Sequence, residues 1–288
     1  MRDQNHPESS RRADPSRAKL SHMGTLRLDL AVARAAFARF ASYRAATVAG
    51  VATNTFFGVL LSAAVVAVAR QRGEVSGYAE QDLVTQVWVM QGLLVTIAIW
   101  GWTELGERIR SGEVAVDLQR PVDLQRWWLS HDLGRAAYHA LVRGTAPFVI
   151  ASLLFTLRLP TDVATVPLFV ISVVLAVVVS FGLRYLTNLA AFWIGDVRGV
   201  VRLSMAVWTA LSGATVSLAF FPDRAERVLR WLPFAPMMQA PSDVWLERDA
   251  GMGRLAPIGQ QLMWVVVVLG VGRVVQARGV RRVVINGG

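Results

Sequence analysis

The chain has 288 residues, of which 54% are apolar and 17% are charged. This balance leaves too little polar surface to cover a soluble globule of this size, so lipid is the expected solvent. The net charge of +10 comes almost wholly from arginine, because Lys19 is the only lysine. The sequence contains no cysteine, which excludes disulfides, thiolate metal sites and cysteine nucleophiles.

Residues 1–22 are polar, contain proline and lack apolar periodicity, and we interpret them as a disordered cytoplasmic tail. They have no apolar stretch of the kind found in a cleaved signal peptide. Residues 24–44 then show apolar side chains at steps of three and four, with Arg27 and Arg34 on another face: Leu26, Leu30, Ala33, Phe37 and Phe40. This pattern predicts a basic amphipathic helix in the cytoplasmic interface, or a helix that extends the first span inward.

Residues 23–288 are expected to form one all-α membrane domain with six spans. A spanning helix needs roughly 20 mainly apolar residues. Four segments reach that length without a charge, namely residues 45–69, 83–103, 163–183 and 203–221. Residues 255–272 form a shorter uncharged run that reaches spanning length when it is extended to Ala277.

The third span is the least regular one, because Arg135, His139 and Arg143 occupy the first half of residues 134–157. Either these side chains snorkel to the cytoplasmic headgroups while the helix crosses, or the segment is only interfacial. We prefer the crossing helix, because it gives the even number of spans that places both termini on the same side of the membrane. In the fourth span, apolar character continues past Arg184 to Gly195, and we expect this end to protrude from the membrane; the alternative is that Arg184 faces protein or water inside the bundle.

The arginines lie beside the apolar segments rather than among aromatic residues of a polar domain. This placement favours membrane orientation over nucleic-acid binding, so no nucleic-acid partner is expected. Across six spans, Lys and Arg concentrate on the side shared by both termini, which predicts cytoplasmic termini. Residues 104–133 then form a cytoplasmic loop, and residues 222–254 form an external segment that is either an interfacial lid or a loop packed on the bundle.

The cytoplasmic loop carries charges of both signs and is interrupted by Gly112 and Pro121, which predicts short helices along the membrane. A short charged helix between two spans could dock a soluble motor, or the segment could be an ordinary solvated loop. Together with residues 33–58 and 188–200, the string IRSGEVAVDLQRPVDLQ at residues 109–125 resembles the permease subunits of the ABC-2 family of transporters. The resemblance extends from about Gly24 to the C-terminus.

The resemblance implies half of a dimeric exporter in the cell membrane, with six spans, an elbow helix before the first span, a coupling helix between the second and third, and a short external helical element. The partners would be two ABC ATPase subunits and a second permease, identical or related. Residues proposed for ATPase docking are Glu107, Arg108, Arg110, Gly112, Glu113, Asp117, Arg120, Pro121 and Asp123.

The chain has no GxxxxGK[ST] loop, so ATP and Mg²⁺ would be bound by the partner ATPase and this chain would bind no cofactor or metal and have no catalytic residues of its own. Polar residues within spans are candidates for a translocation path, although hydrogen bonds between helices also explain them. These candidates are Asn54, Gln86, Gln91 and Asn188. The alternative functions are a non-transporting membrane scaffold or assembly factor and an ion-coupled carrier, but a carrier needs ionisable groups near the midplane, and the predicted spans have almost none there.

Overall fold

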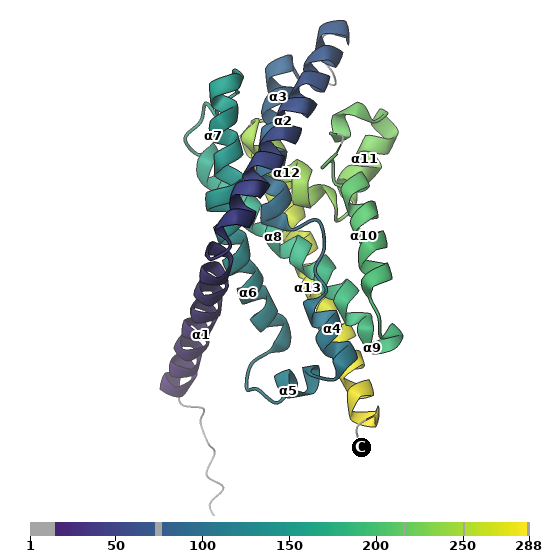
Figure 1. Ribbon diagram of the computed structural model, residues 1–288. Helices are drawn as coiled ribbons and strands as arrows, with labels where there is room; N and C mark the ends of the chain where they lie inside the picture. Colours follow the sequence, from purple (N-terminus) through teal and green to yellow (C-terminus); the bar gives the residue numbers. More distant parts are fainter. Residues whose placement is uncertain (1–14, 73–76, 216, 250, 287–288) are drawn as a thin grey trace, which may run out of the picture.

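The computed structural model describes residues 15–72, 77–215, 217–249 and 251–286, which form a bundle of helices (Figure 1). The helices are α1 (Pro15–Ala41), α2 (Arg44–Arg72), α3 (Glu80–Ile97), α4 (Glu104–Ser111), α5 (Val114–Leu118), α6 (Leu124–Tyr138), α7 (Thr145–Leu154), α8 (Thr165–Leu189), α9 (Ala191–Ile194), α10 (Arg198–Leu211), α11 (Asp223–Trp231), α12 (Ala235–Trp245) and α13 (Ala256–Asn286). A π-helix, η1 (His139–Gly144), joins α6 to α7, and two 3₁₀ turns are η2 (Leu218–Phe220) and η3 (Gly251–Leu255).

Four helical stretches in the described part of the chain are long and apolar enough to cross a membrane: Arg44–Gln71, Leu124–Leu154, Thr165–Ile194 and Gly251–Arg282. They coincide with the first, third, fourth and sixth predicted spans. The irregular third segment is therefore part of one long helical stretch. The helices at the second and fifth positions, α3 and α10, do not meet the same measure of length and hydropathy, and α10 has 14 residues, or about 21 Å.

The fifth predicted span is shorter as a helix than the apolar run of residues 203–221 indicated. Helix α10 ends at Leu211, and Gly213 has a φ of +83°, a left-handed conformation that stops the helix. The second predicted span also stops early, at Ile97, because Ala98 takes a φ of +55°. A run of apolar residues shows where lipid or protein surrounds the chain, but it does not show where the backbone leaves the helix.

Helix α2 packs on α3 through small and polar residues that recur every four positions. Asn54, Gly58 and Ser62 lie buried on this face, and a Cβ atom at Gly58 would lie 2.6 Å from the ring of Trp88; Gly50, one turn earlier, lies against Arg143 of η1. Small residues let two helices approach closely where lipid supplies no hydrophobic driving force between them. Most other α2 side chains are exposed, as expected of a helix that faces lipid.

Helix α1 lies along α6. The Asp29 carboxylate accepts hydrogen bonds from the guanidinium group of Arg126 and from the Ser130 hydroxyl, the latter at 3.1 Å. Gly134 of α6 sits against the backbone of Ala33. In Figure 1, α1 leads to the lower end of α2 with a similar slant, which fits the alternative that it extends the first span. The helix begins at Pro15, inside the predicted tail, and residues 1–14 of that tail lie outside the described residues.

The segment of residues 222–254 folds into two different kinds of helix. Helix α11 keeps Val228 and Trp231 exposed, whereas α12 is buried from Ala235 to Val244 and packs against α8 and α13. For α12, the structure therefore selects the packed alternative over a lid.

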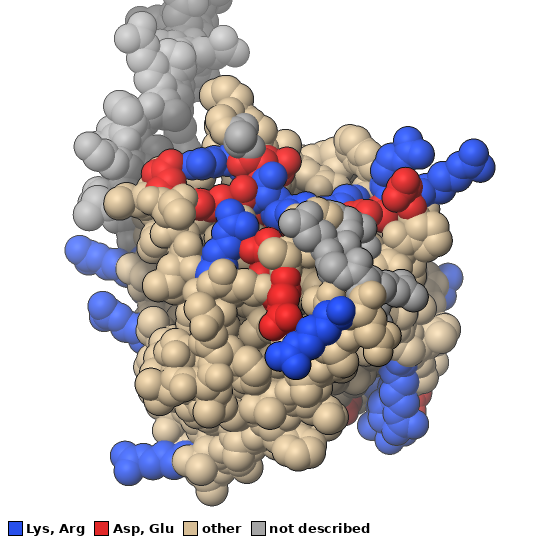
Figure 2. Space-filling model, turned by 90° about the horizontal axis from the view of Figure 1, so that it is seen from above, with Lys and Arg blue, Asp and Glu red and all other residues tan. Residues whose placement is uncertain are grey.

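The two ends of the bundle differ. The start of α1, the end of α13, α4 and α5 lie at the lower end in Figure 1. Figure 2 shows basic and acidic side chains gathered on the opposite end. Ion pairs there include Arg230 with Asp243 at 2.6 Å and Arg158 with Asp82 at 2.8 Å. The described termini therefore lie at the same end as α4 and α5.

Candidate coupling surface and internal cavity

The loop between α3 and α6 is folded around Arg108. Its guanidinium group donates hydrogen bonds to Asp117 at 2.6 and 2.9 Å and to Glu113 at 3.0 Å. The hydrogen bond to Asp117 is the main reason that the pKa of Arg108 is raised above its ordinary value. Gly112 permits the sharp turn between α4 and α5, because its φ is +83°. Arg108 therefore fastens α4 to α5.

Asp123 has an equally local role. Its carboxylate accepts a hydrogen bond from the backbone N–H of Arg126 at 2.8 Å, which caps the start of α6. It also forms an ion pair with Arg273 of α13 at 3.2 Å. Three of the residues proposed for docking, Arg108, Asp117 and Asp123, thus organise the loop itself.

The remaining predicted docking residues are exposed together at the lower end of the molecule: Glu107, Arg110, Gly112, Glu113, Arg120 and Pro121. Sequence analysis did not select Val116, which is 56% exposed on α5. Its neighbour Val114 is fully buried. The string Val-Ala-Val contains no signal that separates the two valines, since only the packing of α5 decides which one turns outward. We define the coupling surface as these six residues together with Val116.

The coupling surface is joined rigidly to the bundle through Asn188 of α8. The Asn188 Oδ1 accepts a hydrogen bond from the Gly106 N–H at 2.8 Å, and its Nδ2 donates to the carbonyl groups of Trp102 at 2.7 Å and Arg184 at 2.8 Å. A Cβ atom at Gly106 would overlap the side chain of Val197. Asn188 is completely buried, and this arrangement fits a structural joint between α4 and α8 rather than a position on a translocation path.

A buried ion cluster occupies the middle of the bundle. Asp132 accepts hydrogen bonds from Arg135 at 2.7 Å and from Arg184 at 2.6 and 3.2 Å. Arg184 is 1% exposed, so it faces protein inside the bundle, as the alternative to protrusion predicts. Arg135 is also buried and does not snorkel. Buried charges in a membrane domain persist when they are paired in this way.

The same cluster explains why α3 can end inside the bundle. Arg135 donates to the carbonyl oxygens of Val95 and Thr96, each at 2.9 Å, and Ser180 donates to that of Ile97 at 2.7 Å. These carbonyl groups belong to the last helical turn, where a helix leaves acceptors unsatisfied; that of Val95 also accepts from the Ala98 N–H at 3.2 Å. The positive charge of Arg135 also faces the negative end of the helix dipole. Sequence analysis missed Asp132, because it stands in a charged stretch that was assigned to the cytoplasmic loop.

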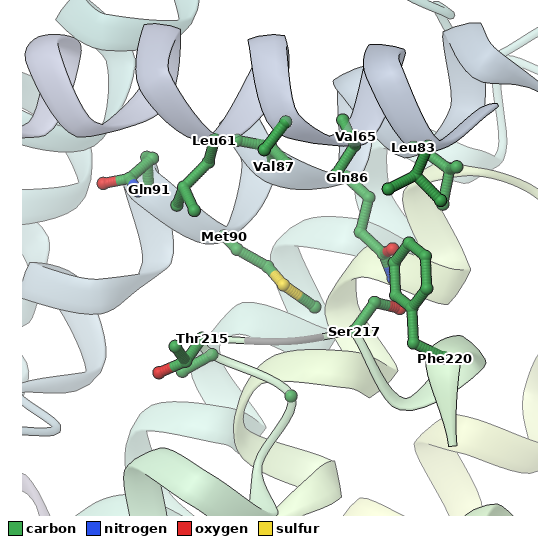
Figure 3. A pocket seen from close by; sticks show the side chains of 14 residues that line it. Leu61, Val65, Leu83, Gln86, Val87, Met90, Gln91, Thr215, Ser217 and Phe220 are labelled. Carbon is green, nitrogen blue, oxygen red and sulfur yellow. The ribbon is translucent and has the colours of Figure 1, made fainter. Parts of the chain in front are cut away.

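A cavity of about 220 Å³ lies between α2, α3 and the segment that follows α10. Figure 3 shows Met90 pointing into it below Leu61, with the amide of Gln86 beside the ring of Phe220. Gln86 is buried, and its Nε2 has no hydrogen-bond partner among the described residues. Gln91 also lines the cavity, and its backbone carbonyl oxygen accepts a hydrogen bond from the Asn54 side-chain amide at 3.2 Å. Two of the four predicted path residues thus line one cavity, and Asn54 is hydrogen-bonded to the backbone of one of them.

The molecule is a multi-pass helical membrane protein. It has long apolar helices, a buried ion cluster and short charged helices, α4 and α5, at one end. A family model described as ABC-2 family transporter protein matches residues 55–287. The chain therefore belongs to the ABC-2 transporter family, which confirms the resemblance inferred from the sequence. Membership implies a membrane setting and association with ABC ATPase subunits. No curated protein sequence matches the chain.

Proposed function

We propose that this chain is the membrane-spanning permease subunit of an ABC exporter, powered by two copies of a separate ATPase and paired with a second permease half. Family membership is the observation that carries this proposal. The cargo would be a small or amphiphilic molecule. The sequence has no phosphate-binding loop, so ATP and Mg²⁺ would be bound by the ATPase subunits.

In this proposal the chain crosses the cell membrane six times. Helices α3 and α10 supply the second and fifth crossings together with the non-helical segments that follow them. Such irregular backbone is tolerated within a membrane where protein surrounds it. Helix α1 would take the place of the expected elbow helix and lead into the first span from the cytoplasmic face, in line with its slant in Figure 1. Both termini and the coupling surface would then be cytoplasmic.

The coupling surface would transmit ATPase movements to the bundle. A push on α4 reaches α8 through the hydrogen bonds of Asn188, and α8 connects to the end of α3 through Arg184, Asp132 and Arg135. Helix α3 lines the cavity that holds Gln86 and Gln91. This contiguous set of buried contacts offers a route by which the cavity could alternate between two arrangements.

The docking assignment can be tested by co-purification with the cognate ABC ATPase. We expect Val116→Asp to weaken capture of the ATPase by about tenfold or more, because it puts a charge where the docked ATPase would bury an exposed valine. Val228→Asp is the matched control, since Val228 is 62% exposed on α11 at the opposite end. Equal capture by both variants would refute the docking surface, and a wild-type chain that captures no ATPase would refute the proposed function.

A further inference from the structure

Arg143 occupies an unusual place within the third span. It belongs to the π-helix η1, and its guanidinium group rests on Gly50 of α2. A Cβ atom at position 50 would overlap the guanidinium group, so only glycine leaves room for this contact. Single π-helical turns inside longer helices are frequent at functional sites. The π-helical turn and the space left by Gly50 therefore both place the Arg143 guanidinium group beside α2.

Arg143 has no counter-charge within the described residues, where no acidic side chain pairs with it and its buried Nε donates no hydrogen bond. Arg135 and Arg184, by contrast, share Asp132. The groups around Arg143 are polar but not anionic. The Thr47 hydroxyl, one turn from Gly50 on α2, donates to the Tyr43 carbonyl at 3.0 Å and accepts from the Tyr138 hydroxyl at 2.7 Å, so both protons are already used within the chain. A cation within a span is costly unless it is paired, so an anion from outside the chain is expected to complete this site.

The depth of Arg143 indicates which anion is available. Helix α2 has 29 residues and is about 43 Å long, which exceeds a hydrocarbon core of about 30 Å by about 13 Å. Exposed arginines stand near both of its ends, at Arg44 and Arg70, so about 6 Å of helix lies outside the core on each side. Gly50 is about 9 Å from Arg44 along the axis. Arg143 therefore lies just inside the hydrocarbon boundary, within reach of lipid phosphates.

We propose that Arg143 forms a binding site for the headgroup of an anionic phospholipid. The guanidinium group binds the phosphate through charge-assisted hydrogen bonds. The acyl chains lie along the exposed side of α2, where Phe57 follows Gly50 by two helical turns and Phe57 and Leu60 are 48% and 54% exposed. Arg44, exposed at the start of α2, adds positive charge at the headgroup level. In the proposed topology, this site faces the inner leaflet; only that assignment of the leaflet rests on the proposed function.

The test is a lipid titration of the purified full-length chain, followed by native mass spectrometry. The probes are phosphatidylglycerol and phosphatidylcholine with identical acyl chains. We expect the wild-type chain to prefer phosphatidylglycerol, and Arg143→Gln to bind it about tenfold more weakly. Arg143→Lys keeps the charge and should retain the preference for phosphatidylglycerol. Arg34→Gln is the matched control, because it removes one exposed arginine of α1 and should leave binding unchanged.

Gly50→Ala decides the question if Arg143→Gln fails to fold. Its methyl group displaces the flexible guanidinium group without removing any charge, and alanine favours the helix. We expect Gly50→Ala to bind phosphatidylglycerol as weakly as Arg143→Gln does. The proposal is overturned if Gly50→Ala or Arg143→Gln binds like the wild type, if Arg34→Gln loses as much, or if the two lipids bind equally. No ATPase takes part in this assay, so its outcome is independent of the proposed transport function.

Discussion

Replacement of Asp132 by asparagine should destabilise the chain strongly. Asp132 is the shared carboxylate of Arg135 and Arg184, and all three side chains are buried. Asp132→Asn leaves two buried guanidinium groups with one amide oxygen between them. Removal of one partner from a buried ion pair costs about 3–5 kcal/mol. For a chain of this size, that loss corresponds to a fall in melting temperature of roughly 6–20 °C.

The assay is thermal unfolding in detergent micelles, followed by the fluorescence of the ten tryptophans. Asp29→Asn is the matched control, because it breaks the partly exposed pair with Arg126, and such pairs contribute little to stability. The double change Asp132→Asn with Arg184→Gln should cost less than the sum of the single changes, since it removes a charge together with its partner. A melting temperature for Asp132→Asn equal to that of Asp29→Asn would refute the account of the ion cluster.

Three further predictions concern the two ends of the bundle. Burial alone would raise the pKa of Glu247, but hydrogen bonds from the Thr161 and Thr165 side chains and from the backbone lower it to about 2. The stability that this carboxylate contributes is thus present above its usual pKa of 4.5 and is lost as the pH falls towards 2. A nitroxide attached to Val163→Cys should therefore become more mobile as the pH falls from 4.5 to 2. In Glu247→Gln, the same nitroxide should already be mobile at pH 5. Gly106→Ala should destabilise the chain by overlap with the Val197 side chain, whereas Gly112→Ala, which has open space, should cost only about 1 kcal/mol for its positive φ; unfolding midpoints that rank in the reverse order would contradict this. Asn188→Ala should leave ATPase capture intact but reduce ATP-dependent transport by about tenfold, and unchanged transport would remove Asn188 from the coupling route.

Features with a local cause could be predicted from the sequence. Four of the six predicted spans correspond to helical stretches fit to cross a membrane, because hydropathy over about 20 residues is a property of the segment itself. Gly112 also ends α4 as predicted, since a left-handed position favours glycine wherever it occurs. The family resemblance rested on similar short strings, and the family match confirms it.

Features that depend on distant partners could not be predicted. The burial of Arg184 is one such feature, because its partner Asp132 lies 52 residues away in a stretch that the sequence pattern assigns to a loop. The sequence pattern shows Asn188 only as a polar residue within a span. Its hydrogen bonds to Gly106, Trp102 and Arg184 depend on how α8 packs against α4 and the residues before it. The exposure of Val116 depends in the same way on how α5 packs against its neighbours.

Photo-crosslinking from α5 tests the central claim most directly. The chain has no cysteine, so Val116→Cys provides a single attachment point for a thiol-reactive benzophenone, and Val228→Cys provides the equivalent point at the opposite end. In native membranes, the account predicts a crosslink from position 116 to a polypeptide that carries ATP-binding motifs, and none from position 228. Crosslinks to such a polypeptide from position 228 alone, or from neither position, would contradict an ATPase docked on α5.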